Sequence, residues 1–370
     1  MSISQLSITH LRNIGSLKLE LSPQINLFHG ANGSGKTSVL EAVHLLSLGR
    51  SFRTSKHKLY IQHEQPDTLL FGRVLAGYQG ELPIGFQRQR DGVLKIRISG
   101  ESIDSLATLA ELLPIQLINS DTFLLLEGSP SVRRQFIDWG GFHLEPRFLA
   151  AWKAVRRALQ QRNSLLKHGR MQASVRATWD HEFIERALEL DSYRQAYLDL
   201  LIPCFEQLLR QLLELDDLSL HYQCGWDKKR GLDQVLEQGL ERDRTLGFTQ
   251  QGPQRADLKV KLRGMLAADI LSRGQQKLVV SALKVAQGYL LQQLTERSCI
   301  YLIDDLPAEL DRQHRQRLCR LLEQLKSQIL VTSTDKDAFE GCWSTDVEVR
   351  DFTLSEGALA HEDSIDPIRL

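Results

Sequence analysis

The sequence predicts an α/β fold in which mixed sheets flanked by helices form a head, with an α-helical arm inserted into it. Three observations lead to this prediction. The apolar run INLFHG leads into a glycine-rich loop and then into a segment with helical apolar spacing. Apolar runs of strand length alternate with helix-like segments near the C-terminus. The stretch between has helical spacing, so we expect residues 1–128 and 217–370 to form the head and residues 129–216 the arm.

The composition is that of a globular protein. The 370 residues include 46 Lys and Arg against 46 Asp and Glu, and 42% are hydrophobic, which excludes a disordered or fibrous chain. No run approaches the roughly 18 apolar residues of a membrane span, and the N-terminus lacks the pattern of a secretion signal. Five scattered cysteines without a CxxC pair favour free thiols over a zinc site. We expect a cytoplasmic protein without a membrane partner.

The N-terminal part of the head has strand patterns. Apolar residues alternate with polar ones over 3–8 and 17–21, as in a partly solvated sheet. The segment SVLEAVHLLSL predicts a helix after the glycine-rich loop. Between Leu69 and Ser99, three runs bounded by Gly and Pro predict a meander, and PIQLINS predicts a further buried strand.

The arm has two limbs of opposite charge. From Ser131 to Arg176 there are ten Lys and Arg against two Asp and Glu, and from Asp180 to Asp217 there are ten Asp and Glu against three Lys and Arg. Both limbs have apolar residues at helical spacing, which predicts an antiparallel helical hairpin. The two charges either neutralise each other across the hairpin or leave a basic face for a partner.

Strand patterns return after the arm. LSLHYQCGW and LKVKLRG predict strands on either side of the loop TQQGPQRADL, and Gly274–Leu294 predicts a helix. Cys299–Ile303 and SQILVTST are apolar runs of buried strands. We expect the acidic C-terminal segment HEDSIDPIRL to be frayed.

The strongest motif is a complete match to GxxxxGK[ST]. It consists of Gly30, Ala31, Asn32, Gly33, Ser34, Gly35, Lys36 and Thr37, followed by Ser38. The glycines let backbone N–H groups point at phosphate oxygens, Lys36 adds a positive charge, and Thr37 offers a hydroxyl to Mg²⁺. An ordinary glycine-rich turn would not require the Lys-Thr pair. The motif therefore predicts a site for ATP and Mg²⁺.

The second motif is the apolar strand that ends in Asp304 and Asp305. In partnership with the first motif, Asp304 is the candidate ligand of Mg²⁺ and Asp305 the candidate to polarise the attacking water. Taken alone, an apolar strand that ends in Asp is common and carries no such meaning.

The third motif, LSRGQQK, opens a helix at Leu271–Lys277 and resembles the signature of ABC-type ATPases. In such proteins the counterparts of Ser272 and Gly274 meet the γ-phosphate of ATP bound by the other subunit. Ala308-Glu309-Leu310-Asp311 resembles their D-loop. Ser272 can also be read as a helix cap and Leu310-Asp311 as a turn.

Further motifs narrow the resemblance. Leu11-Arg12-Asn13 resembles an element of SMC-like heads whose Arg and Asn lie beside the nucleotide, with Leu in place of the usual Phe. GANGSGKTSVLEAVHLL, GRSFR, SVRRQFIDWG, GPQRADL and LIDDLPAELD occur in order over nearly the whole chain. Together these motifs are similar to those of the RecF family of bacterial repair proteins, in its proteobacterial form.

The resemblance implies an ABC/SMC-like P-loop ATPase head with a helical arm. It implies a homodimer that forms around ATP, binds duplex and single-stranded DNA at gaps without sequence specificity, and helps RecR and RecO place RecA on SSB-coated strands, with SOS induction as the consequence. It also implies a weak, DNA-stimulated ATPase in which hydrolysis acts as a switch.

Several features depart from the ABC pattern. Asp305 stands where Glu is usual, and its shorter side chain predicts slow turnover. The switch histidine is absent, and Thr332 to Thr334 are the candidates for contacts to the γ-phosphate or its water. Gln116 is a weak candidate for the ABC glutamine loop.

DNA contacts require Lys and Arg that neutralise phosphates. The basic limb offers such residues, with Arg156 and Arg157 as the densest pair, and Arg53 and Lys56 lie on a second candidate surface. Each of these side chains can instead belong to an ordinary solvated face, and Arg133-Arg134 can form structural ion pairs. Trp139 and Trp152 fit a core better than a base-stacking platform.

Three other functions are weighed against this one. The nucleotide-binding subunit of a membrane transporter lacks the inserted arm and the Leu11-Arg12-Asn13 element. A DNA-tethering SMC-type ATPase requires a long coiled coil, for which this chain is too short. A small-molecule kinase accounts for the first motif only.

Overall fold

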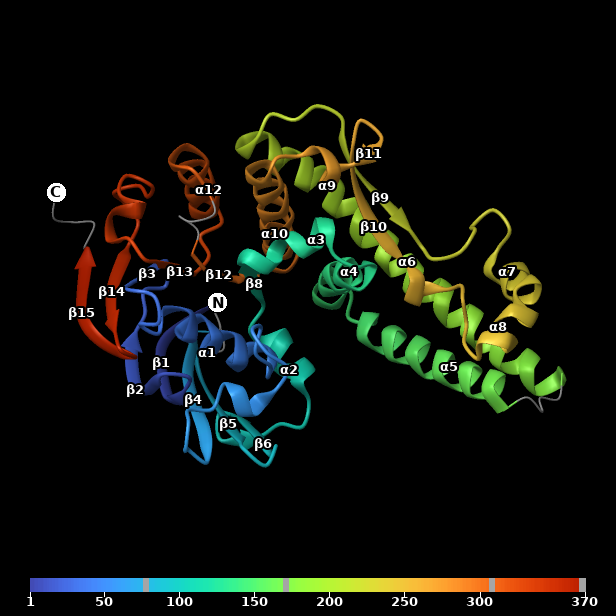
Figure 1. Ribbon diagram of the computed structural model, residues 1–370, viewed down its shortest axis with the longest axis horizontal. Coiled ribbons are helices and arrows are strands. Elements are labelled where there is room, and N and C mark those ends of the chain that lie inside the picture. The colour runs from blue at the N-terminus through green and yellow to red at the C-terminus, as the bar shows by residue number, and fades with distance from the viewer. Residues whose placement is uncertain (76–79, 169–172, 306–309, 366–370) are drawn as a thin grey trace. The chain divides into compact units, whose positions relative to one another are not determined.

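A computed structural model describes residues 1–75, 80–168, 173–305 and 310–365 (Figure 1). The chain divides into two compact units. Unit 1 comprises Met1–Thr122, Gln211–Leu213 and Lys277–Leu370, and unit 2 comprises Phe123–Arg210 and Glu214–Gln276. Within the described residues, no helix is both long and apolar enough to cross a membrane.

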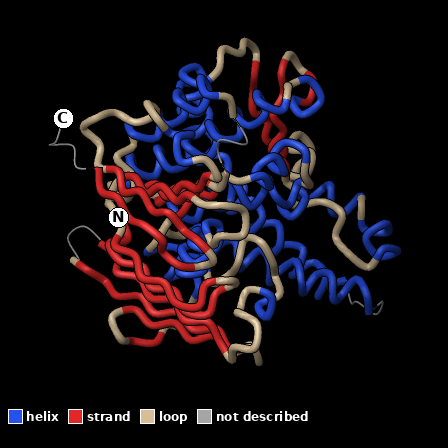
Figure 2. Tube along the Cα trace, turned by 60° about the vertical axis from the view of Figure 1, so that its left-hand side comes forward, coloured by secondary structure: helices blue, strands red, loops and turns tan. Residues whose placement is uncertain are grey.

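Unit 1 contains two six-stranded sheets, drawn in red in Figure 2. The first is antiparallel in the order β2-β1-β4-β5-β6-β7, with β1 (Ser2–Leu11), β2 (Ile14–Glu20), β4 (Asp67–Leu75), β5 (Glu81–Gln89), β6 (Leu94–Ile98) and β7 (Glu101–Ser102). The second has the order β15-β14-β3-β13-β12-β8, with β3 (Ile25–His29), β8 (Ile115–Ile118), β12 (Ile300–Ile303), β13 (Ile329–Ser333), β14 (Val349–Ser355) and β15 (Ala358–Ile365). Only the β14–β15 pair of the second sheet is antiparallel.

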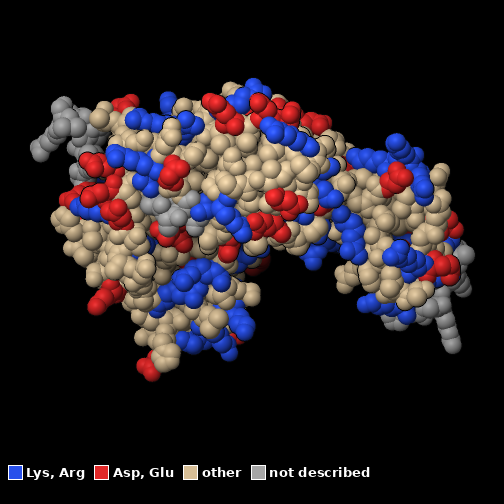
Figure 3. Space-filling view, turned by 45° about the horizontal axis from the view of Figure 1, so that its top comes forward, with Lys and Arg blue, Asp and Glu red and all other residues tan. Residues whose placement is uncertain are grey.

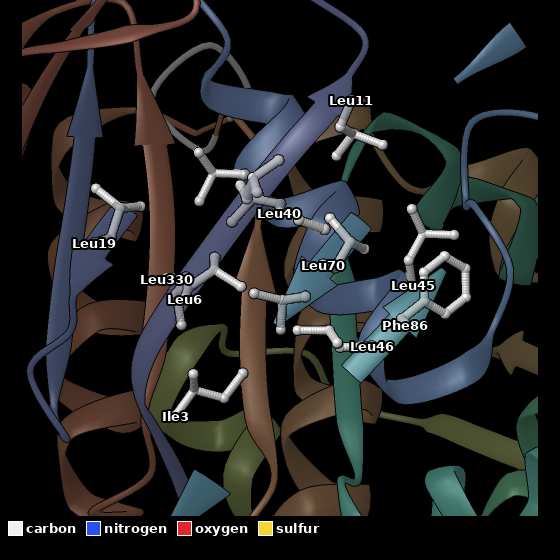
Figure 4. Packing of buried hydrophobic residues seen from close by; sticks show 14 of the residues in the cluster. Ile3, Leu6, Leu11, Leu19, Leu40, Leu45, Leu46, Leu70, Phe86 and Leu330 are labelled. Carbon is white, nitrogen blue, oxygen red and sulfur yellow. The ribbon is translucent and has the colours of Figure 1, made fainter. Parts of the chain in front are cut away.

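The core of unit 1 forms around helix α1 (Lys36–Leu48), which contacts strands of both sheets. Leu40 and Leu45 of α1 belong to one buried cluster with Leu6 and Leu70 of the first sheet and Leu330 of the second (Figure 4). Each fully buried side chain of this size contributes about 1.5–3 kcal/mol. Because α1 follows the glycine-rich loop directly, this burial fixes one end of the loop.

Three more helices complete the main elements of unit 1. They are α2 (Leu106–Leu112), α12 (Arg312–Gln324) and most of α10 (Arg273–Thr295), whose first turn belongs to unit 2. Crossover helices between parallel strands are the usual way to cover a sheet of this kind.

Unit 2 is built mainly of helices. They are α3 (Leu124–Glu127), α4 (Pro130–Leu144), α5 (Phe148–His168), α6 (Ala173–Leu212), α7 (Leu232–Gln238), α8 (Leu240–Leu246) and α9 (Ala267–Ile270). Helices α5 and α6 lie side by side (Figure 1) and share a core that includes Val155, Phe183 and Leu190. A small antiparallel sheet has the order β11-β10-β9, with β9 (Leu218–Gln223), β10 (Asp257–Leu262) and β11 (Met265–Leu266).

The predicted α/β fold with flanking helices is confirmed, with two differences. Residues 214–276 group with the helices of unit 2, because β10 packs on α4 rather than extending a sheet of the head. The prediction of a frayed C-terminal segment was wrong as far as Ile365, since β15 pairs with β14 along its whole length.

Candidate functional site

The glycine-rich loop lies at the end of a fully buried strand. All five residues of β3 are buried, and β3 pairs in parallel with β13, which pairs in parallel with β12. Parallel strands present their carboxyl ends at the same edge of a sheet. The loop after His29 and the carboxylates after Ile303 are therefore neighbours, although about 270 residues separate them in sequence.

A hollow of about 480 Å³ opens at this edge. Its lining consists of Arg12, Asn13, Asn32, Gly33, Ser34, Gly35, Lys36, Thr37, Ser38, Arg53, Ser120, Asp304, Asp305, Thr332 and Thr334. Gly30 and Ala31, although outside this lining, belong to the same loop and contact Lys36. The sequence motifs from both ends of unit 1 thus meet in one place.

Lys36 folds back onto its own loop. Its Nζ donates hydrogen bonds to the carbonyl oxygens of Gly30 at 2.6 Å and Ala31 at 2.9 Å. Burial lowers the pKa of Lys36, while the carboxylates of Asp305 and Asp304 act in the opposite direction. The ammonium group is therefore held at the loop by carbonyls that a phosphate group can replace.

Thr37 and Asp304 form the centre of the hollow. The Thr37 hydroxyl donates to Asp304 Oδ1 at 2.9 Å, and the Thr332 hydroxyl donates to the same oxygen at 2.7 Å. Thr332 Oγ1 also accepts a hydrogen bond from the backbone N–H of Asp305 at 2.9 Å. Thr332 thereby fixes both acidic residues, and it was only one of three hydroxyl candidates in the sequence.

Asp305 has an unusual backbone conformation, with a φ of 53°. For a residue other than glycine, this left-handed conformation is uncommon and costs free energy. The hydrogen bond from the Asp305 N–H to Thr332 helps to hold it there.

Asn13 and Arg12 border the loop in different ways. Asn13 Nδ2 donates to the carbonyl oxygen of Gly33 at 2.8 Å, and Ser38 Oγ lies 3.4 Å from Asn13 Oδ1. Arg12 instead forms two hydrogen bonds of 2.7 and 2.8 Å with the carboxylate of Glu41. Its side chain lines the hollow, but its guanidinium group is paired inside the protein.

Glu41 and Ser120 are site residues that the sequence analysis missed. The Glu41 side chain is fully buried and also accepts a hydrogen bond from Ser51. Arg53, considered there for DNA contacts, lines the hollow and lies 3.7 Å from Glu41. A buried glutamate on a helix is not recognisable from a single sequence, because its partners come from distant segments.

Two features show that the residues fit a phosphate group and a magnesium ion. Ser34 Oγ is buried and has no hydrogen-bond partner among the described residues, so a phosphate oxygen would satisfy it. Thr37 and Asp304 bring a hydroxyl and a carboxylate together, and oxygen ligands of this kind suit Mg²⁺.

The signature segment lies in unit 2, where Ser272 and Gly274 are exposed at the start of α10. Ser272 Oγ accepts a hydrogen bond from the N–H of Gln275 at 3.3 Å, and Gln275 Oε1 accepts one from the N–H of Ser272 at 3.0 Å. This reciprocal pair is a capping box. The helix-cap interpretation of Ser272 is thus observed.

The other candidates are placed as follows. Of the D-loop, Ala308 and Glu309 lie outside the described residues, and Asp311 caps α12 by accepting from the N–H of His314. Gln116 is buried and hydrogen-bonded to Gln287, and it does not line the hollow.

The basic residues of unit 2 separate into two groups. Arg133 pairs with Asp257 at 2.6 Å, Arg134 donates to the carbonyl of Ala256, and the buried Arg162 pairs with Asp180 and Asp243. Arg156 and Arg157, by contrast, are exposed on α5, and neither has an ion pair with a described residue. Figure 3 shows Lys and Arg gathered in patches over the helical end of unit 2.

The face of α5 that carries Arg156 and Arg157 is hollowed. The hollow, of about 960 Å³, is lined by Trp152, Lys153, Arg156, Arg157, Leu159, Gln160, Asn163, Ser164 and Lys167. No carboxylate is among these residues. Trp152 donates to Asp138 and supports the guanidinium of Arg156, which lies 4.7 Å from the centre of its ring. Lys56 is exposed on unit 1.

Comparison with known proteins identifies the family. The family model of the RecF/RecN/SMC N-terminal domain matches residues 2–353. The DNA replication and repair protein RecF of Pseudomonas fluorescens is 52% identical over 97% of this chain and 98% of its own length, and that of Pseudomonas syringae pv. syringae is 51% identical over the same shares.

Solved structures show the same fold. That of the recombination mediator protein RecF with ATP, from the RecFOR pathway, matches with a TM-score of 0.84 and 24% identity over 98% of this chain and 97% of that one. An Smc head bound to a winged-helix domain of ScpA matches with a TM-score of 0.60 and 14% identity over 98% and 97%. The chain therefore belongs to the RecF/RecN/SMC family, and within that family its curated relatives are RecF proteins.

Proposed function

We propose that this chain is an ATP-dependent DNA-binding protein of recombinational repair and replication. The observation that carries the proposal is the convergence of Lys36, Thr37 and Asp304 in one hollow at the end of β3. The names of its relatives, DNA replication and repair protein RecF, supply the biological setting.

The side chains of the hollow have distinct tasks in this proposal. Lys36 exchanges the carbonyls of Gly30 and Ala31 for phosphate oxygens of ATP, and the loop N–H groups contribute further hydrogen bonds. Thr37 and Asp304 would hold Mg²⁺, which when bound neutralises charge on the phosphates. Asp305 orients the attacking water and Thr332 fixes Asp304 and Asp305 relative to each other. The short side chain of Asp305 makes hydrolysis slow.

ATP also acts as the link between two copies of the chain. Ser272 and Gly274 lie at an exposed helix N-terminus, where N–H groups and the helix dipole favour an anion. We assign them to the γ-phosphate of ATP held by the partner copy. Assembly then depends on nucleotide, because a ligand that binds only the dimer stabilises it by mass action.

DNA binding is assigned to the exposed face of α5. Lys153, Arg156, Arg157 and Lys167 lie along it over about 21 Å of helix at 1.5 Å per residue, a spacing that suits successive phosphates. Cations that neutralise phosphates carry no sequence information, so we expect binding to duplex and single strands without sequence specificity. Arg53 and Lys56 on unit 1 form the second candidate surface.

We also assign RecR and RecO as partners of this chain, because the similar structure of RecF with ATP is described as part of the RecFOR pathway.

The first test measures molecular mass by light scattering, with and without ATP and Mg²⁺, for the wild type and the variants Lys36→Met and Ser272→Arg. We expect the wild type to double in mass only with ATP and neither variant to do so. Ser272→Arg must still bind ATP in titration calorimetry, whereas Lys36→Met must not. A wild type that binds ATP but stays monomeric, with and without gapped DNA, would overturn the ATP-linked dimer.

A further inference from the structure

A tight turn at the C-terminal end of the chain lies against the glycine-rich loop. In the β14–β15 hairpin, Ser355 pairs with Ala358, so that only Glu356 and Gly357 form the turn. Their φ values are 50° and 80°. Positive φ at both central residues is the mark of a type I′ turn, whose twist matches that of the flanking strands. The turn is therefore a short and stiff projection from the sheet.

The neighbouring strand brings this turn to the loop. Strand β14 pairs in parallel with β3, and Phe352 lies opposite Phe28. Their rings stack with centroids 5.0 Å apart and planes at 12°. Because parallel strands leave the sheet at the same edge, β3 continues into the loop where β14 continues into the turn. The register of this strand pair thus decides which residues meet.

The contact between turn and loop is close. The N–H of Gly357 donates to the carbonyl oxygen of Ser34 at 2.9 Å. A Cβ on Gly30 would lie 2.3 Å from the carbonyl oxygen of Leu354, and a Cβ on Gly35 would lie 3.3 Å from Cα of Gly357. The hairpin thus leaves no room for a side chain at Gly30 and little at Gly35, where the positive φ of the loop also favours glycine.

Gly357 itself cannot be replaced without movement. A Cβ at this position would lie 2.3 Å from the carbonyl oxygen of Asn13, and its φ of 80° is strained for any other residue. The turn is therefore enclosed between the loop and the segment that follows β1. A substitution of Gly357 therefore has to shift the turn, which disturbs its hydrogen bond to Ser34.

We infer that Gly357 is a positioning residue of the nucleotide site and that the β14–β15 turn is the outer wall of the phosphate-binding loop. In a trans peptide the C=O and the following N–H point in opposite directions. Holding the Ser34 carbonyl on the hairpin side therefore directs the N–H of Gly35 away from the hairpin, which leaves it available to a phosphate oxygen. This inference rests on the proposed function, since it assigns the loop to phosphates.

The test compares variants of two glycines that both have a positive φ. Gly357→Ala should weaken ATP–Mg²⁺ binding about tenfold in titration calorimetry, the effect expected when one well-placed hydrogen bond no longer holds the loop. Gly341→Ala is the matched control, because Gly341 has a φ of 67° and a Cβ there would lie 4.0 Å from Nε2 of Gln316. Glu356→Gly, which keeps the turn, should also bind as the wild type does.

A second readout follows the loop directly. Hydrogen exchange of residues 30–37 without nucleotide should be faster in Gly357→Ala than in Gly341→Ala, while the KM for ATP rises and kcat stays within about twofold. Equal affinity and equal exchange in the two variants would overturn the inference.

If Gly357→Ala does not fold, slow exchange of the Gly357 amide in the wild type supports the contact and fast exchange overturns it. Failure of the wild type to bind ATP at all would instead refute the proposed function.

Discussion

At the scale of single residues, Thr332 joins the two acidic residues of the site. Its hydroxyl donates to Asp304 Oδ1 at 2.7 Å and accepts from the N–H of Asp305 at 2.9 Å. One hydroxyl group can do both, since it has one proton and two lone pairs. Valine has the same shape without the hydroxyl, so replacing Thr332 by Val removes both contacts and little else.

We expect Thr332→Val to lower kcat for ATP hydrolysis about tenfold and to change ATP affinity by less than about threefold, because the loop and Lys36 are untouched. Steady-state hydrolysis and titration calorimetry measure the two effects. Thr332→Ser should restore most of the rate. Thr108→Val is the control, since Thr108 is exposed on α2 and does not line the hollow. A normal rate of hydrolysis in Thr332→Val would contradict the role of Thr332 in holding Asp304 and Asp305.

His44 makes the stability of unit 1 depend on pH. It is buried in α1, with Nδ1 2.7 Å from the carbonyl oxygen of Arg50. Burial lowers the pKa of His44 to about 4. The unfolded chain, with a pKa near 6.5, takes up a proton first as the pH falls. The folded state therefore loses stability between about pH 6.5 and pH 4.

We expect His44 to account for a loss of about 3 kcal/mol over this interval. In His44→Asn the amide keeps a donor toward Arg50 but does not titrate, so its free energy of unfolding should fall less between pH 7 and pH 4. Urea unfolding at several pH values measures this. His63→Asn is the control, because the His63 side chain is 92% exposed. Parallel pH profiles of wild type and His44→Asn would contradict the assignment.

At the scale of elements, helix α5 has two faces with different tasks. Its inner face carries Arg162, which is 2% exposed and pairs with Asp180 and Asp243. Its outer face carries Arg156 and Arg157, which are exposed. The basic limb of the sequence is thus divided by the helix into cations that hold unit 2 together and cations available to a partner.

The two faces predict opposite results. Reversing Arg156 and Arg157 to Glu should weaken DNA binding and reduce its salt dependence, with the free energy of unfolding changed by less than about 1 kcal/mol. Arg162→Met should instead destabilise unit 2 by about 3–5 kcal/mol, because the buried Asp243 and the partly buried Asp180 lose their partner. Fluorescence anisotropy with gapped DNA at several salt concentrations and urea unfolding measure the two effects. Unchanged DNA binding in the double variant would move the DNA surface to Arg53 and Lys56.

At the scale of the whole molecule, the proposed half-sites for ATP belong to different units. The loop, Asp304 and Asp305 belong to unit 1, and Ser272 belongs to unit 2. A nucleotide bound to a monomer through its loop stabilises unit 1 only. A nucleotide shared between two copies stabilises both units, since each contributes contacts to it.

Calorimetric unfolding distinguishes these cases. In Ser272→Arg we expect ATP–Mg²⁺ to raise the free energy of unfolding of unit 1 only, by about 2.7 kcal/mol when free ATP is about a hundred times its Kd. In the wild type the free energy of unfolding of both units should rise, and in Lys36→Met that of neither unit should. If ATP–Mg²⁺ stabilised both units of Ser272→Arg, the two units would respond to nucleotide within one copy, which contradicts a nucleotide shared between copies.

The sequence by itself determined the parts of this protein that depend on local order. The loop of residues 30–37, the apolar strand before Asp304 and the helix after Ser272 follow from spacing and residue type, because phosphate binding, burial and helix capping each require particular neighbours in the chain. The α/β fold class followed from the same patterns, and family membership was recognisable from motifs in order.

Only the tertiary structure decided which distant segments meet. The pairing of Arg12 with Glu41, the contact of Thr332 with both acidic residues, and the packing of Gly357 on Ser34 depend on strand order and register. The segment HEDSIDPIRL was expected to fray, yet as far as Ile365 it belongs to a strand, because β14 offers it an edge. Such contacts join residues tens to hundreds of positions apart, and a side chain's type does not reveal which partner the sheet will bring to it.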